Sequence, residues 1–185
     1  QIAVGHRYFA EKFGVNPTTA INFDAFGHSS GLPQIISKSG QDSLILVRPG
    51  NDPIPARQFV WEGVDGSRIK VYASNHGYNS PLGHAAEAIK NRIASQEEDT
   101  ICVLWGVGNH GGGPSKKDLD MIYAMEKDCK AQGIRLIHAT PEKYFGAVEK
   151  ENLPEYKDEL NLWAPGCYTS VIRIKQEYRA LENML

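Results

Sequence analysis

The chain has 185 residues, of which 41 % are hydrophobic and 23 % charged, with a formal net charge of −2. This is the composition of an ordinary globular protein, not of a disordered or membrane-spanning one, and the length is sufficient to bury a sizeable core. Basic and acidic residues are interspersed, and no apolar run approaches the roughly 20 residues that cross a bilayer. We therefore expect neither nucleic acid nor a membrane as a partner.

The cysteines and the first residues bear on the compartment of the protein. Cys102, Cys129 and Cys167 are odd in number and widely spaced, so they indicate neither a disulfide framework nor a CxxC metal site. No secretory signal opens the chain, and a reducing, cytoplasmic location is the simplest expectation. Because the chain starts at Gln1, just before residues with helical spacing, we expect that a preceding segment has been removed.

The first half of the chain predicts strands and helices in alternation. A Gly/Pro/Asn turn leads into a short apolar strand, residues 20–23, which ends at Asp24. Residues 31–39 have apolar positions at helical spacing, and the apolar run 43–47 predicts a second strand. Two further strands are expected on either side of Asp65 and Gly66, because Asp-Gly is a strong hairpin signal.

The second half continues this alternation. We expect helices at 84–94 and 118–132, buried strands at 101–105 and 134–139, and another helix from Pro141, since proline suits the first turn of a helix. Strands that alternate with amphipathic helices favour a mostly parallel sheet. The predicted fold class is therefore α/β, either a parallel-sheet domain or part of a distorted (β/α) barrel.

The last residues have a different pattern. From Thr169 onward apolar residues recur at alternating three and four spacing, at Val171, Ile174, Tyr178, Leu181 and Leu185. Such a seam packs against other helices, and no partner helix remains in the chain. We therefore predict two parts, an incomplete α/β catalytic domain over residues 1–165 and the first helix of a helical-bundle domain over 166–185.

Asp24 is the strongest candidate for chemistry. It lies at a strand end that leads into a glycine-containing loop, where ligands gather in α/β proteins. An aspartate there can be a nucleophile, a metal ligand or the N-cap of the next helix. Ser29 or Ser30 could cap that helix instead, which would leave Asp24 available for other roles.

Four segments together resemble glycoside hydrolase family 38, the family of α-mannosidases. FDAFGHSSGLPQIISKSG resembles its nucleophile segment, and FVWEGVDGSRIKVY resembles its W-x-G-x-DGS hairpin. WGVGNHGGGPS is similar to its G-x-x-GGGP loop, and LNLWAPGCYTSVIRIKQEYRALENML to its YTS junction. The four occur in the family's order and cover most of the chain.

The resemblance implies hydrolysis of terminal α-mannosidic bonds with retention, through a covalent mannosyl-enzyme intermediate. Asp24 matches the family's nucleophile, which also binds Zn²⁺ through its carboxylate. The family's other zinc ligands come from His-x-Asp and His-Asp segments that this sequence lacks, so we expect them outside this chain. One carboxylate does not hold Zn²⁺ tightly, and the isolated chain is expected to be inactive.

The second carboxyl group of a retaining glycosidase, which serves as acid and then as base, matches Glu159, with Asp158 as second choice. The alternative is a solvated charge run between helices. Phe26 matches an aromatic beside the sugar, although a core role is equally open. Tyr168, in the YTS junction, is a further predicted substrate contact.

Two histidines are candidate sugar contacts. His110 lies in the glycine-rich loop, whose glycines could let the backbone approach a sugar closely. A structural turn is the alternative there. His28 could face the site or be a structural histidine.

Two rival functions stay open at this point. A metal-dependent polysaccharide deacetylase would share the α/β barrel and a strand-end aspartate, but its Asp-Asp pair and His-x-x-x-His run do not occur here. A non-catalytic carbohydrate-binding remnant is the other. The predicted partners are a mannose-containing oligosaccharide or glycan and the remainder of the polypeptide. The linkage preference and the oligomeric state are left open.

Overall fold

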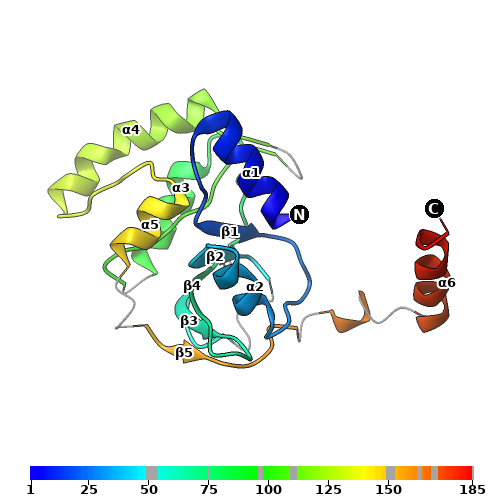
Figure 1. Cartoon of the computed structure of the whole chain (residues 1–185). Coiled ribbons are helices and arrows are strands. Elements are labelled where there is room, and N and C mark those ends of the chain that lie inside the picture. The colour runs from blue at the N-terminus through cyan, green and yellow to red at the C-terminus, as the bar shows by residue number, and fades with distance from the viewer. Residues whose placement is uncertain are drawn as a thin grey trace.

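A mixed β-sheet lies at the centre of the described part of the chain (Figure 1). The computed structural model describes residues 1–48, 54–74, 76–95, 98–108, 112–148, 153–161, 164–167 and 171–184. Its five-stranded sheet has the order β1-β2-β4-β3-β5, with β1 Thr19–Asn22, β2 Ser43–Leu46, β3 Gln58–Glu62, β4 Arg68–Ala73 and β5 Glu155–Tyr156. Strands β1, β2 and β4 are parallel, β3 runs antiparallel to β4, and β5 is parallel to β3. The predicted α/β class is confirmed.

The hairpin between β3 and β4 forms where the Asp-Gly signal predicts it. Gly66 has a φ of 82°, which a residue without a side chain adopts easily, and its amide donates to the Gly63 carbonyl at 3.0 Å. The Asp65 carboxylate accepts from the Ser67 amide at 3.0 Å and pairs with Lys38 at 2.7 Å. The Lys38 ammonium lowers the pKa of Asp65 to about 2. Local turn chemistry therefore fixes the hairpin's register.

The helices follow the predicted pattern, with boundaries that shift by a few residues. They are α1 Ile2–Phe13, α2 Leu32–Lys38, α3 Ala85–Ala94, α4 Lys116–Ala131, α5 Pro141–Ala147 and α6 Ile172–Glu182, with the short 3-10 helix η2 at Pro165–Cys167. Ser115 and Thr140 cap α4 and α5, because each side chain accepts a hydrogen bond from an amide in the first helical turn.

The sheet buries both of its faces. On one face, Trp61 and Leu44 pack with Ile36 of α2 in a fully buried cluster. On the other, Ile45 and Tyr72 pack against the aromatic residues of α5. A third cluster joins α3 to α4. Strand β2, whose four residues are all buried, is therefore enclosed on both sides, as its apolar sequence indicates.

The predicted strands at 101–105 and 134–139 are wrong as strands, because the described residues there have no ladder partner. Both segments are nevertheless part of the packing. Val103 and Trp105 pack on the α3 and α4 cluster, while Cys102 and Leu104 pack toward α5. Side-chain burial thus follows the alternation of a strand, but the backbone pairing that defines one is missing. Strand β5 was not predicted.

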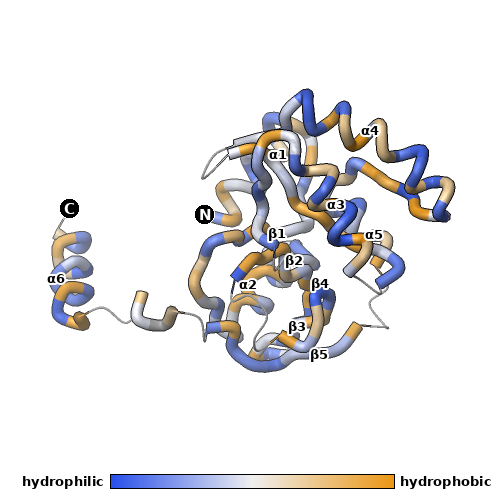
Figure 2. Tube along the Cα trace, turned by 180° about the vertical axis from the view of Figure 1, so that it is seen from behind, coloured by the Kyte–Doolittle hydropathy of each residue, from blue (hydrophilic) through white to orange (hydrophobic). Residues whose placement is uncertain are grey.

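Helix α6 lies apart from the sheet and the other helices (Figure 1). None of its residues is buried, and apolar and polar residues alternate along it (Figure 2). Within the described residues its predicted seam is exposed, with Ile174 at 62 % and Tyr178 at 63 %. The division into a catalytic and a helical domain stays a prediction. None of the described helices is long and apolar enough to cross a membrane.

Candidate active site at the carboxyl edge of the sheet

The candidate site is built on the ends of two neighbouring parallel strands. Asn22, the last residue of β1, pairs with Leu46, the last residue of β2. Asp24 and Arg48 each lie two residues beyond this pair, so the register brings them to the same edge. The Nε atom of Arg48 donates to Oδ1 of Asp24 at 2.9 Å. Asp24 is 45 % exposed, so the ion pair orients a carboxylate that solvent can still reach.

Arg48 also connects Asp24 to the predicted aromatic contact. Its guanidinium carbon lies 5.4 Å from the ring centroid of Phe26, within the range of a cation–π contact. Arg48 was not predicted from the sequence. The signal that could have found it is the pairing of the two strands, since both residues follow an apolar strand at the same offset. The site therefore contains a cation between the carboxylate and the aromatic ring.

Asp24 does not cap the next helix. The N-cap of α2 is Gly31, which has no side-chain capping bond, and Ser29 Oγ accepts a hydrogen bond from the Gly31 amide at 3.1 Å. The capping alternative for Asp24 is therefore wrong. What remains from the sequence is the choice between a nucleophile and a metal ligand, two roles that one carboxylate can combine.

The chain brings the Glu159 segment against the Asp24 segment. His28 and Leu160 exchange two backbone hydrogen bonds, each 2.9 Å long. A side chain at Gly27 would meet the Asn161 backbone at 3.0 Å, so the two segments are in close contact. Trp61 Nε1 donates to the Asp158 carbonyl at 3.0 Å and ties the second segment to the sheet. Two carboxyl candidates that are distant in sequence thus occupy adjoining loops.

The two acidic residues of that segment differ in their contacts. Asp158 Oδ1 accepts from the Glu159 amide at 2.8 Å, so this carboxylate stabilises its own turn. Glu159 Oε2 accepts from the side chain of Asn161 at 3.1 Å. Both residues are exposed. Asp158 thus contacts the backbone of its own turn and Glu159 a neighbouring side chain, and the choice between them as acid and base stays a prediction.

His28 is buried beneath the candidate site. It is 4 % exposed, and its ring meets Trp61 edge to face with centroids 6.4 Å apart. Burial lowers the pKa of His28, and a weaker opposing effect comes from its hydrogen bond with the Arg48 backbone. The buried imidazole packs beneath the loop, and the predicted contact of His28 with a sugar stays a prediction. His110 and Tyr168 lie outside the described residues.

The described part of the glycine-rich loop is held by close backbone contacts. The Val107 amide donates to the Gly113 carbonyl at 2.8 Å. A Cβ atom at Gly112 would lie 1.0 Å from the Val107 carbonyl oxygen. The conformation of the loop therefore requires a glycine at position 112. The close approach of a sugar, which was expected to explain the glycines, is not needed to explain Gly112.

A buried carboxylate fixes the same loop to the start of α3. Asp118 is fully buried and accepts hydrogen bonds from the Ala85 amide at 3.0 Å and from the Ser115 hydroxyl. The Ser115 hydroxyl, followed by backbone amides, lowers the pKa of Asp118. One carboxylate thus stabilises the N-termini of two helices that leave this edge.

Comparison with known proteins identifies the family. The sequence model described as "Glycosyl hydrolases family 38 N-terminal domain" matches residues 1–165. The chain belongs to glycosyl hydrolase family 38. It is 27 % identical to human "Alpha-mannosidase 2C1" over all of this chain and 18 % of that protein. It is 25 % identical to "Alpha-mannosidase" of Saccharomyces cerevisiae over all of this chain and 19 % of that protein.

A solved structure shows the same fold. The crystal structure of an alpha-mannosidase from Enterococcus faecalis V583 superposes with a TM-score of 0.64 and 21 % sequence identity, over 85 % of this chain and 19 % of that one. This family 38 chain therefore spans about a fifth of the length of the relatives it matches.

The described residues of this family 38 chain do not assemble a complete metal site. No group of three His, Cys, Asp or Glu side chains in the part that the structure describes could hold a metal ion. Asp24 is exposed at a strand end and suits the role of one ligand, but its described contacts supply no second. The donor set in this part of the chain does not fit a zinc site by itself.

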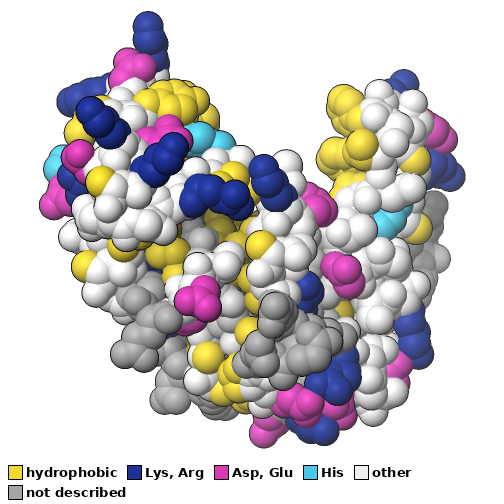
Figure 3. Space-filling model, turned by 90° about the vertical axis from the view of Figure 1, so that its left-hand side faces the viewer, with side chains coloured by type: hydrophobic (Ala, Val, Ile, Leu, Met, Phe, Trp, Pro, Cys, Tyr) yellow, Lys and Arg dark blue, Asp and Glu magenta, His cyan; other side chains and the backbone are white. Residues whose placement is uncertain are grey.

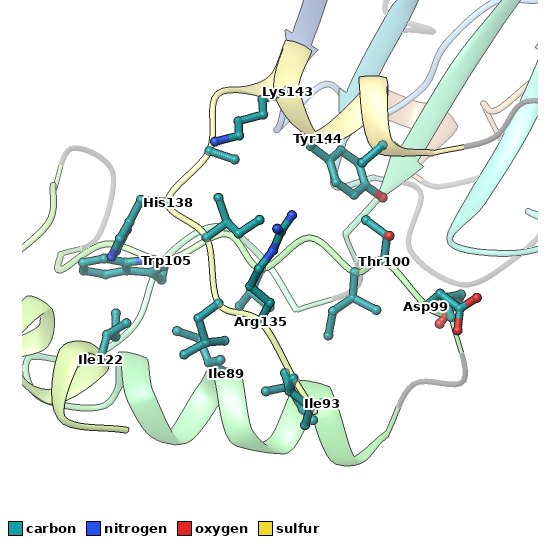
Figure 4. A pocket seen from close by; sticks show the side chains of 18 of the residues that line it. Ile89, Ile93, Asp99, Thr100, Trp105, Ile122, Arg135, His138, Lys143 and Tyr144 are labelled. Carbon is teal, nitrogen blue, oxygen red and sulfur yellow. The ribbon is translucent and has the colours of Figure 1, made fainter. Parts of the chain in front are cut away.

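A cavity of about 660 Å³ lies away from Asp24, between α3, α5 and the two extended segments (Figure 4). Its lining is largely apolar and includes Ile89, Ile93 and Trp105, and Arg135 and Lys143 also line it. Among the described residues, none of the predicted site residues lines it. Around this part of the molecule, acidic and basic side chains are interspersed (Figure 3). The cavity is therefore distinct from the candidate active site.

Proposed function

We propose that the protein containing this chain hydrolyses terminal α-mannosidic bonds, with Asp24 as nucleophile. The observation that carries the proposal is the Asp24–Arg48 pair at the carboxyl edge of the sheet, 2.9 Å long and accessible to solvent. Membership of family 38 and the α-mannosidase relatives supply the substrate class. Since the chain is only a fifth of those relatives, the activity is assigned to the whole protein.

The proposed reaction proceeds with retention in two steps. An Asp24 oxygen forms a bond to the anomeric carbon as the glycosidic C–O bond breaks, and Glu159 gives its proton to the departing oxygen. Water then attacks the same carbon, Glu159 takes its proton, and the ester bond to Asp24 breaks. Arg48 holds the Asp24 carboxylate in one orientation. Attack from a fixed position lowers the entropic cost of the first step.

The proposal of Glu159 as acid and base is supported by the contact between its turn and the Asp24 loop. The His28–Leu160 bridge holds the Glu159 turn beside the Asp24 loop, and Glu159 remains exposed. Asp158 is the second choice, because it already serves its own turn. Phe26, beside Arg48, is the aromatic residue proposed to contact the sugar.

We further propose that Asp24 contributes one ligand to a Zn²⁺ ion whose other ligands come from outside this chain. The ion would act as a Lewis acid that holds sugar hydroxyl groups. A cytoplasmic location also remains a proposal, to which the described free thiols Cys102, Cys129 and Cys167 are suited.

The test is turnover of an aryl α-mannoside by the full-length natural protein and its Asp24→Ala variant. We expect kcat to fall by about a thousandfold or more, because the covalent step is lost. Asp120→Ala is the matched control, since Asp120 is exposed on α4. Turnover by Asp24→Ala within a few-fold of wild type would disprove the nucleophile assignment.

A 2-fluoro-mannosyl fluoride probe tests the covalent step directly. The proposal expects a mannosyl adduct on the peptide that contains Asp24, identified by mass spectrometry. Such an adduct excludes both a deacetylase and a non-catalytic remnant. Release of acetate from an acetylated chito-oligosaccharide, without turnover of the mannoside, would favour the deacetylase instead.

A further inference from the structure

Two aromatic rings are stacked next to the proposed nucleophile. The rings of Phe23 and Tyr78 are nearly parallel, with centroids 5.1 Å apart and an interplanar angle of 15°. Phe23 directly precedes Asp24, and Tyr78 belongs to the loop that follows β4. Strands β1 and β4 point in the same direction in the sheet, so both loops leave its carboxyl edge. Neither ring belongs to the set of residues predicted from the sequence.

The inner ring of the pair is fixed by the core. Phe23 packs against the buried cluster that contains Ile45 and Tyr72. Because that cluster is part of the sheet and α5, the ring has a firm support. Tyr78 stacks on Phe23, and both rings are half-buried. The face of the Tyr78 ring opposite Phe23 is its outer face.

The loop that holds Tyr78 is tied down on both sides of it. The Ser74 hydroxyl donates to the Gly77 carbonyl at 2.8 Å, and Gly77 has a φ of 72°. After Tyr78, the Ser80 amide donates to the Gly106 carbonyl at 2.7 Å. A ring held in this way loses little further freedom when a ligand covers it, so binding has a small entropic cost.

We propose that Tyr78 is a substrate-binding residue whose outer face receives the apolar C–H face of the mannose ring, an assignment that rests on the proposed function. An aromatic face carries negative charge density and attracts the slightly positive hydrogens of a sugar's C–H face. Sugar pockets combine such flat apolar surfaces with a few polar groups. Asp24 supplies the polar group one residue from the supporting ring.

The experiment compares Tyr78→Phe with Tyr78→Leu in the full-length natural protein on an aryl α-mannoside. Phenylalanine keeps the flat ring, so KM should stay within about twofold of wild type. Leucine removes the aromatic face, and KM should rise by about tenfold, with a smaller change in kcat. Tyr123→Leu on α4, where the tyrosine is 57 % exposed, is the matched control and should leave KM unchanged.

A wild-type measurement covers the case in which a variant does not fold. Nitration of Tyr78 by tetranitromethane, followed by mass spectrometry, should slow when methyl α-mannoside is added, while nitration of Tyr123 should not. If Tyr78→Leu keeps the wild-type KM, if Tyr78→Phe is impaired as much as Tyr78→Leu, or if the sugar does not protect Tyr78, the inference is wrong and the stack only anchors its loop.

The two proposals fail in different ways. Absence of mannoside turnover by the wild-type protein would overturn the proposed function, and the nitration experiment would still decide whether Tyr78 binds the sugar. Turnover that is lost in Asp24→Ala but unchanged in Tyr78→Leu would overturn the role of Tyr78 alone.

Discussion

Extended segments bury their side chains in two different ways in this protein. Strand β2 is paired on both edges, and all four of its residues are buried. Residues 134–139 are also apolar and lie along α4, but only Ile134 and Leu136 reach the partly buried class. Within the described residues this segment has no ladder. An extended segment can therefore pack against a helix without forming hydrogen bonds to a neighbouring strand.

In the extended segment at residues 98–105, side chains bond backbone groups that have no neighbouring strand in the described part of the chain. Tyr72 donates its hydroxyl to the Cys102 carbonyl at 2.5 Å, and the side chain of Gln58 bonds the Thr100 carbonyl. Side chains therefore satisfy carbonyl groups of residues 98–105 that a ladder would otherwise pair. Packing holds this extended segment in place, but within the described residues no ladder pairs its amides as those of β2 are paired.

Amide hydrogen exchange gives the largest contrast between the two regions. In the 185-residue chain, we expect the amides of β2 to exchange at least about a hundredfold more slowly than those of residues 135–138, because a paired backbone opens only with the sheet. Mass spectrometry of labelled peptides measures this. Equal protection in the two segments would show that residues 135–138 have a backbone partner after all.

A matched pair of substitutions tests the packing difference. Leu44→Ala removes a side chain that is 1 % exposed and should lower the free energy of unfolding by about 2–5 kcal/mol. Leu136→Ala, at a partly buried position, should cost less than about 1 kcal/mol. Urea denaturation of both variants measures the two values. Similar costs would mean that both segments belong to one equally packed core.

The smallest expected effect is a pH dependence centred on the sheet region. Burial lowers the pKa of His28 in the folded state, so below about pH 6.5 the unfolded chain binds the proton more readily. Stability should therefore fall with decreasing pH below that value, by at most about 1.4 kcal/mol per pH unit for this group. Melting curves between pH 7.5 and 5.5 measure it, with His28→Gln as the variant that should flatten the dependence. A slope unchanged in His28→Gln would assign the effect to another group, such as the less buried His76, whose pKa burial also lowers.

The sequence was sufficient for features that depend on local chemistry. The Asp65–Gly66 turn, the apolar run of β2 and the stripes of α3 and α4 each contain their own signal, and each appears in the structure. Asp24 was singled out as a candidate for the same reason, since a strand end followed by a glycine-containing loop is a local pattern, and its chemical role stays a prediction.

Features that depend on a distant partner were not predictable. The β1–β2 register places Arg48 beside Asp24. The bridge between His28 and Leu160 places the Glu159 turn beside the Asp24 loop. No pattern within either segment indicates the other. The prediction of strands at 101–105 and 134–139 was wrong for the same reason. An apolar sequence pattern does not show whether a neighbouring strand is present to pair with it.

The contact between Gly112 and Val107 has a consequence for attempts to alter this loop. A methyl group at position 112 would overlap the Val107 carbonyl oxygen, whereas one at Gly113 would meet nothing within 4 Å. There is therefore space for a side chain at position 113 but not at position 112 of the same loop. A mutant library of this loop can vary position 113, and most of its members would be lost if position 112 were varied too.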